Sequence, residues 1–230
     1  MTERGSIEWL QQRLGYSPRD FSLFESALTH RSAAGQNNER LEFLGDSVLN
    51  LLVSERLYGR YPEATEGDLS RLRARVVSGP PLAAVAQGLG LGEMLRLGSG
   101  ELKTGGFRRE SILADALEAL LGAVFLDGGL DAAREVVARL FDELIASAPD
   151  PAELKDSKTR LQEYLQARGL PLPSYGVLAV SGEPHAQAFR VGCTVEALQV
   201  RAEGEGSSRR RAEQAAAARA LGEITATADR

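Results

Sequence analysis

The stretch NERLEFLGDSVLNLLVSERL, residues 38–57, decides the fold of the first part of the chain. Its apolar residues recur at spacings of three and four, which predicts an amphipathic helix over Leu41–Leu57. Glu39, Glu42 and Asp46 keep the same spacing, so this helix would place three carboxylates on one face. Most neighbours of these acids are apolar. The stretch therefore predicts a core helix that carries a row of acids.

A second acidic helix is predicted over Ser111–Leu126, with Ser111 as a possible N-terminal cap and Gly128-Gly129 as its stop. Asp115 and Glu118 lie on one face of this helix, and most of its other positions are apolar. A helix this apolar has little solvated surface, so the two acids would crowd like charges into a confined place. Together the two helices predict acids that are enclosed by core residues.

Two interpretations of these acids are open. Acids at helical spacing often belong to a solvated face, whereas the apolar surroundings here favour a divalent cation that offsets the repulsion. Oxygen ligands suit Mg²⁺ or Mn²⁺ rather than zinc. A carboxylate di-iron site would need a Glu-x-x-His motif, which neither His30 nor His185 supplies. Magnesium held by acids can activate water and stabilise a phosphoryl oxygen, which indicates phosphodiester hydrolysis.

The first 145 residues are predicted to be helical. Gly79-Pro80-Pro81 would stop one helix, and a Gly-rich passage would cover Gly90–Gly106. Besides the two acidic helices, the apolar spacing predicts helices over Ile7–Leu14, Phe21–Leu28, Asp68–Val77, Leu82–Leu89 and Leu130–Ile145.

The pattern changes after a proline-containing stretch. The expected order there is α-β-β-β-α, with a Gly-rich turn over Gly204–Ser208 before the last helix. The elements are a helix over Lys158–Arg168, strands over Tyr175–Ser181, Ala188–Val195 and Leu198–Glu203, and an alanine-rich helix through Leu221. We therefore expect two domains, an all-α domain over 1–147 and a small α+β domain over 156–226, joined by a linker over 148–155.

Charge is distributed unevenly between these parts. The chain has a net charge of −5, but residues 1–154 carry 16 Lys/Arg against 23 Asp/Glu, whereas residues 155–230 carry 11 against 9. The mildly basic second part concentrates positive charge in Arg209-Arg210-Arg211, here called the phosphate clamp. A local basic patch can bind a polyanion even on an acidic chain.

Other classes of protein are disfavoured. No apolar run is long enough to span a membrane, and the first residues lack the pattern of a signal peptide. Cys193 is the only cysteine, lies in a strand pattern and is expected to be buried, which favours a reducing cytoplasm over a disulfide-forming compartment. Phe189 is expected in the core. The glycines near residue 100 do not form a nucleotide-binding loop.

Residues 38–47, NERLEFLGDS, resemble the signature of the ribonuclease III family. Residues 27–32 (ALTHRS), 66–70 (EGDLS) and 106–115 (GFRRESILAD) resemble further motifs of this family in the same order, and the C-terminal part resembles a double-stranded-RNA-binding domain. The resemblance implies a homodimeric endonuclease that cuts duplex RNA, leaves 5′ phosphates, 3′ hydroxyls and short 3′ overhangs, and processes ribosomal, messenger and transfer RNA precursors.

The resemblance also assigns roles to residues in the first domain. Glu42, Asp46, Asp115 and Glu118 match the metal-binding acids, and Asp46 and Glu118 are the catalytic ones among them. Glu39 and Glu66 match acids that handle the substrate. Phe43 matches an aromatic residue that packs into the partner subunit, although a core position is an equal alternative. Within its motif, His30 is expected to hold a helix end or a neighbouring backbone group rather than to act as a base.

In the second domain, a reader of duplex RNA must span two minor grooves and the phosphates between them. By resemblance, Thr159, Gln162 and Glu163 match contacts to one groove, and His185 lies in the loop that enters the next. The phosphate clamp matches a cluster of cations at a helix N-terminus, where the helix dipole adds to their charge. Some relatives have lysine at the position of Glu213, so this acid is expected to weaken the clamp.

Two alternatives come from other classes. A non-catalytic RNA-binding regulator with the same fold would lack the function of the acids, and duplex RNA incubated with and without Mg²⁺ would reveal it. The other alternative, a metal-dependent phosphohydrolase that acts on small molecules, would not explain the second domain.

Overall fold

The computed structural model describes residues 3–149, 156–183 and 187–228. The chain divides into two compact units, residues 1–151 and 152–230, and each is described by itself. Most of the predicted linker, residues 150–155, lies outside the described residues, as does His185. Among the described residues, no helix combines the length and the apolarity that crossing a membrane requires.

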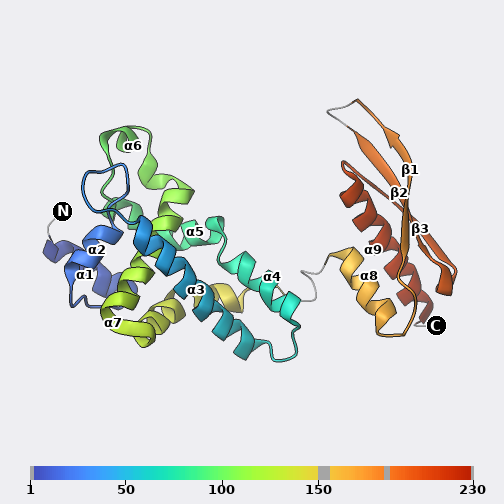
Figure 1. Cartoon of the computed structure of the whole chain (residues 1–230), viewed down its shortest axis with the longest axis horizontal. Helices are drawn as coiled ribbons and strands as arrows, with labels where there is room; N and C mark the ends of the chain where they lie inside the picture. Colours follow the sequence, from blue (N-terminus) through green and yellow to red (C-terminus); the bar gives the residue numbers. More distant parts are fainter. Residues whose placement is uncertain (1–2, 150–155, 184–186, 229–230) are drawn as a thin grey trace. The chain divides into compact units, whose positions relative to one another are not determined.

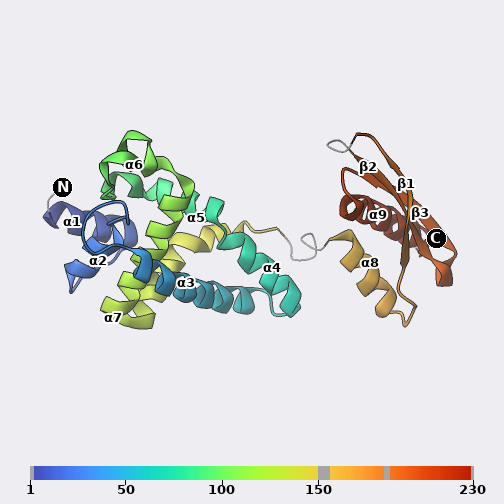
Figure 2. The same cartoon turned by 45° about the horizontal axis from the view of Figure 1, so that its top comes forward.

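The first unit is helical (Figure 1). Its elements are α1 (Glu3–Leu14), α2 (Phe21–Ala27), α3 (Glu39–Arg60), α4 (Glu66–Val76), α5 (Gly79–Leu89), η1 (Leu91–Met94), α6 (Ser99–Lys103), η2 (Gly106–Arg108) and α7 (Glu110–Ala146). The long helix α7 supplies much of the core, and it packs most extensively against α3. Figure 2 shows the same two helices crossing in a second view.

Two glycines bring the backbones of α3 and α7 together. A Cβ atom on Gly45 would lie 1.7 Å from the carbonyl oxygen of Glu118, and one on Gly122 would lie 2.3 Å from the carbonyl oxygen of Leu41. Real Cβ atoms do not approach backbone this closely, so side chains larger than hydrogen are excluded at the crossing. The two acidic helices are therefore in direct backbone contact beside their acids.

Two local predictions for this unit need correction. Ser111 does not cap α7, because the turn η2 leads the chain into a helix that begins at Glu110, with Arg109 in the N-cap position. The helix predicted over Leu82–Leu89 begins earlier, at Gly79: α4 ends before the Pro80-Pro81 pair as predicted, but this pair also begins α5, where proline lacks only a donor that the first turn would leave unpaired. Gly129 ends the helical geometry as predicted (φ 82°, ψ −175°), so the residues labelled α7 comprise two helices that meet at this break.

The second unit confirms the predicted α-β-β-β-α order. It consists of α8 (Ser157–Gln166), β1 (Ser174–Ser181), β2 (Ala188–Val195), η4 (Glu196–Leu198), β3 (Val200–Gly206) and α9 (Arg209–Ala228). The strands form an antiparallel sheet in the order β1-β2-β3, and both helices lie on one side of it (Figures 1 and 2). Cys193 is buried, as predicted, and Phe189 is half-buried.

The third strand differs from its prediction. It begins at Val200 rather than Leu198, because residues 196–198 form the turn η4 and Gln199 has a positive φ of 53°. It also runs through the predicted Gly-rich turn to Gly206. A Cβ atom on Gly204 would lie 2.1 Å from the backbone nitrogen of Ala216. Glycine here thus serves the close packing of β3 against α9.

Candidate active site

Acids from α3 and α7 meet beside the helix crossing. Glu42, Asp115 and Glu118 each place a carboxylate oxygen within 4.8 Å of the others, and we call them the acid cluster. The glycine contact explains this proximity, because Gly45 lies between Glu42 and Asp46 and touches the backbone of Glu118 itself. All three side chains are partly buried, so water screens their charges only in part.

Asp46 lies one helical turn beyond Glu42 but outside the acid cluster. Its carboxylate accepts a hydrogen bond of 2.8 Å from the side-chain amide of Asn50, which also donates to the backbone oxygen of Asp46 at 2.9 Å. Asn50 was not singled out from the sequence, although its position four residues after an acid could have indicated the pair. The amide leaves the second carboxylate oxygen of Asp46 to other partners.

Burial raises the pKa of every member of the acid cluster, and repulsion by neighbouring acids adds to this for Glu118 and Glu42. The pKa of Glu118 rises to about 8, first through burial and then through Asp46, Asp115 and Glu42. Burial, followed by Asp115, raises the pKa of Glu42, and burial raises that of Asp115 against the opposing charges of His30 and Arg31. Without a cation, the site therefore holds a proton on Glu118 at neutral pH.

The acid cluster fits a divalent metal ion. The acid cluster offers only carboxylate oxygens as ligands, and hard cations prefer such oxygens. One oxygen from each of the three side chains lies close enough to the other two for all three to contact one ion. A cation among them would replace the proton on Glu118 and offset the repulsion that contributes to the raised pKa values of Glu118 and Glu42. The geometry and the charges of the acid cluster thus both fit a divalent metal ion.

The pH dependence of stability should reveal this repulsion. The folded state holds a proton on Glu118 between the ordinary glutamate pKa and about 8, whereas the unfolded chain releases it. The metal-free protein should therefore lose stability as the pH rises from about 4.5 to about 8. We expect thermal unfolding in a chelator to show a falling Tm over this window, and Mg²⁺ to raise the Tm most at its alkaline end.

Glu118→Gln is the control for this effect. The variant has no carboxyl group to deprotonate at position 118, so its metal-free Tm should vary less with pH in the same window. An equally steep fall in wild type and variant would show that the repulsion at Glu118 does not control the stability.

A polar cavity of about 430 Å³ lies next to the acid cluster. Glu39 lines it together with Glu42 and Asp115, so the structure brings this predicted residue to the site. Glu66 lies elsewhere: it accepts a hydrogen bond of 2.7 Å from Ser70 and lines a separate pocket beside α3.

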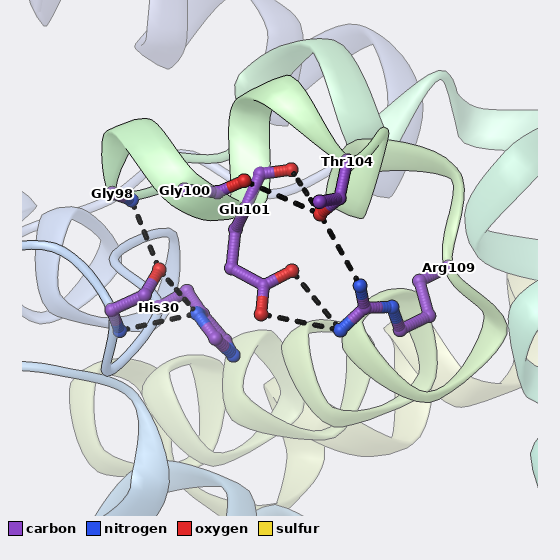
Figure 3. Close-up of polar contacts among 7 residues, drawn as sticks. His30, Gly98, Gly100, Glu101, Thr104 and Arg109 are labelled. Carbon is purple, nitrogen blue, oxygen red and sulfur yellow. Dashed lines mark hydrogen bonds and ion pairs between the residues drawn. The ribbon is translucent and has the colours of Figure 1, made fainter.

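Two separate groups of hydrogen-bonded residues, which the sequence did not reveal, contribute to one wall of the cavity (Figure 3). Arg109 contacts both carboxylate oxygens of Glu101, at 3.2 and 3.0 Å, and Thr104 at 3.4 Å. The hydroxyl of Ser32 accepts from the backbone N–H of Gly98 at 2.9 Å, and the ring of His30 accepts from the backbone N–H of Ser32 at 3.2 Å. His30 thus holds a neighbouring backbone group, as predicted.

In the second unit, the predicted RNA contacts lie on α8 and at the start of α9. Asp156 caps α8 through the backbone N–H of Thr159 at 2.8 Å. The members of the phosphate clamp are exposed, and the side chain of Arg211 bonds Ser207 at 3.1 Å. Thr159 and Gln162 are partly buried, and Glu163 is exposed.

The fold and the acid cluster define a class: a nuclease domain followed by a domain that binds double-stranded RNA. The family model described as Ribonuclease-III-like matches residues 20–144, and the one described as Double-stranded RNA binding motif matches residues 157–224. The chain belongs to the ribonuclease III family and is an endoribonuclease.

Relatives with known names agree. The chain is 58% identical over 212 residues to Ribonuclease 3 of Alkalilimnicola ehrlichii, covering 92% of this chain and 93% of the relative. It is 57% identical over 216 residues to Ribonuclease 3 of Pseudomonas fluorescens, covering 94% of each. The first unit resembles a crystal structure of the nuclease domain of ribonuclease III from Campylobacter jejuni, with a TM-score of 0.59 and 42% identity over 62% of this chain and 98% of that one.

Proposed function

We propose that the protein hydrolyses phosphodiester bonds of double-stranded RNA with Mg²⁺ held by Glu42, Asp115 and Glu118, and with Asp46 beside them. The observation that carries this proposal is the convergence of three carboxylates within 4.8 Å in a chain that also contains a duplex-binding motif. When bound, the ion would supply Lewis-acid activation of water and stabilise charge on the phosphate. Mn²⁺ has the same ligand preference and would substitute.

The residues of the chain have separate tasks in this proposal. Glu42, Asp115 and Glu118 hold the ion, and Asn50 keeps Asp46 oriented through its hydrogen bond of 2.8 Å. Glu39 faces substrate from the adjacent cavity. Products with 5′ phosphates, 3′ hydroxyls and short 3′ overhangs, and precursors of ribosomal, messenger and transfer RNA as substrates, are part of the same proposal.

End-labelled duplex RNA provides the test. Purified protein should convert it to short duplexes when Mg²⁺ is present, and it should leave both a single-stranded RNA of the same sequence and a metal-free duplex reaction intact. Binding of the duplex without cleavage at saturating Mg²⁺ would favour the non-catalytic regulator instead.

We further propose domain bounds of 1–147 and 156–226, and a homodimer formed through α3. Phe43 is 78% exposed, Leu51 56% and Tyr58 75%, so in the isolated chain Phe43 is not a core residue. Exposed apolar groups of this size mark association surfaces. A second Campylobacter jejuni structure, with a TM-score of 0.58, 44% identity and coverage of 60% of this chain and 96% of that one, is described as flexible in a region involved in dimer formation of its nuclease domain.

We also propose a role for Glu66 and a cellular location. Glu66 lines an apolar pocket beside the exposed side chains Leu51 and Tyr58 of α3, and we assign it to substrate handling from there. The free, buried thiol of Cys193 supports a cytoplasmic location.

RNA binding is assigned to Thr159, Gln162 and Glu163 on α8, to His185 in its loop, and to the phosphate clamp. Arg210→Ala should remove about one phosphate contact, which weakens binding roughly fivefold to tenfold at about 0.1 M salt and lowers the salt slope by about one. Filter binding across a salt series, in chelator, measures both quantities.

Arg201→Ala is the matched control, because Arg201 is an exposed arginine of β3 in the same unit, outside the residues assigned to RNA. It should leave affinity and slope close to wild type. Equal effects of the two substitutions would mean that the clamp has no special role.

A further inference from the structure

Glu213 lies among the cations of the second unit, where an acid was expected to weaken RNA binding. Its side chain is only 12% exposed, and each of its oxygens has its own cationic partner. Oε2 accepts from Nζ of Lys158 at 2.7 Å, and Oε1 accepts from Nε of Arg209 at 2.9 Å. The carboxylate is therefore occupied on both sides, in a partly desolvated place where charge-assisted hydrogen bonds are strong.

The two partners of Glu213 belong to different helices. Lys158 lies in the first turn of α8, next to Thr159, and Arg209 is the first residue of α9. A second link runs parallel to this one, since the side-chain oxygen of Gln214 accepts from the backbone N–H of Lys158 at 3.0 Å. Glu213 and Gln214 thus join the N-terminal ends of α8 and α9.

The Lys158 side chain has little freedom to choose another partner. It is 28% exposed, and its Nζ lies 4.4 Å from the centre of the Tyr175 ring, which a cation favours. Lys158 and Arg209 also lower the pKa of Glu213 through these bonds, so the acid stays charged at neutral pH. The result is a bridge of alternating charge, Lys158–Glu213–Arg209.

We propose that Glu213 is a positioning residue for duplex RNA: by holding Lys158 and Arg209 together, it sets the spacing between the groove-contacting face of α8 and the phosphate clamp. The inference rests on the RNA contacts proposed above for these two elements. A duplex presents its minor groove and its phosphates at fixed separations. A binding domain whose two helices are already held at the matching distance therefore loses less conformational entropy when it binds. Glu213 acts in this way without touching RNA.

A positioning role and a purely electrostatic role predict opposite changes in RNA affinity when Glu213 is removed. Removing a negative charge near the phosphate path should tighten binding if only electrostatics mattered. If Glu213 positions the clamp, Glu213→Ala should instead weaken binding by roughly fivefold to tenfold at about 0.1 M salt, the cost of about one phosphate contact. Glu205→Ala is the control, because it removes an exposed acid of β3 that is not part of the bridge.

The experiment uses the full chain and a blunt duplex longer than the ~16 base pairs that one such domain spans. Affinity is measured in chelator across a salt series, and cleavage is measured separately with Mg²⁺. We expect Glu213→Ala to weaken binding, to lower the salt slope and to raise KM with kcat unchanged, while Glu205→Ala stays close to wild type. Unchanged or tighter binding by Glu213→Ala would overturn the proposal.

A charge exchange separates positioning from simple loss of stability. Glu213→Lys should weaken binding although it adds positive charge, and the double variant Lys158→Glu/Glu213→Lys, which has the net charge of wild type, should recover part of the lost affinity. If Glu213→Ala melts below the assay temperature, Glu213→Gln, of nearly the same size, decides in its place, and binding equal to wild type would again overturn the proposal.

Arg210→Ala, measured alongside, tests the proposed function on which the inference rests. Weaker binding by Arg210→Ala together with an unaffected Glu213→Ala would reject the positioning role alone. No effect of either substitution would reject the clamp itself.

Discussion

Glu118→Gln should lower the rate of duplex RNA cleavage by about a thousandfold or more while leaving the affinity for duplex RNA close to wild type. Glu118 belongs to the acid cluster and has its pKa raised to about 8 by burial and by its acidic neighbours. The amide has nearly the same shape but no charge, so it binds a divalent cation poorly. Single-turnover cleavage at saturating Mg²⁺ and binding in chelator measure the two quantities.

A matched substitution is available in the same helix. Glu143 is exposed on α7, and Glu143→Gln should cleave RNA at the wild-type rate. If Glu118→Gln also cleaved at that rate, the acid cluster would not be the catalytic centre.

Gly45→Ala should produce the second large effect. The added methyl group would lie 1.7 Å from the carbonyl oxygen of Glu118, so α3 and α7 must move apart where the acid cluster forms. Overpacking of this kind costs about 1–3 kcal/mol or more in the free energy of unfolding. A displacement of about 1 Å between catalytic groups lowers activity by about a hundredfold. Thermal unfolding and single-turnover cleavage check the two consequences.

Gly59→Ala separates crowding from the ordinary effect of alanine in a helix. Gly59 lies in α3 as well, and a Cβ atom there meets nothing within 4 Å. This variant should be as stable as wild type or slightly more stable, because alanine is the better helix former. Comparable losses from both substitutions would show that the contact at Gly45 is not special.

Much of the fold follows from local pattern. The spacing of apolar residues predicted the helices that become α3 and α7 and the order of elements in the second unit, because each needs only a buried face and a turn that ends it. The errors lie at the ends of helices and strands. Proline begins α5 because its missing donor costs nothing there. The start of β3 moves to Val200 because residues 196–198 form η4 and Gln199 takes a positive φ, which a glutamine in a sequence does not indicate.

The site was predictable in part, for a physical reason. Helical spacing puts Glu42 and Asp46, or Asp115 and Glu118, on one face, but it does not say that the two faces meet. Gly45 and Gly122 decide this through their contacts, which depend on the tertiary structure. The Glu101–Arg109 wall and the Lys158–Glu213 contact were missed because their partners come from separate elements, whereas Arg209 and Glu213 are four residues apart in α9 and this pair could have been predicted.

The crossing of α3 and α7 also bears on how the enzyme responds to heat. Where side chains separate two helices, they can change rotamer and let the helices move apart gradually. Where the backbones touch directly, as at Gly45 and Gly122, there are no such rotamers to change. The distance between ligands from the two helices is therefore a constant of the native fold until cooperative melting. The arrangement of the acids should accordingly be lost together with the fold and not before it.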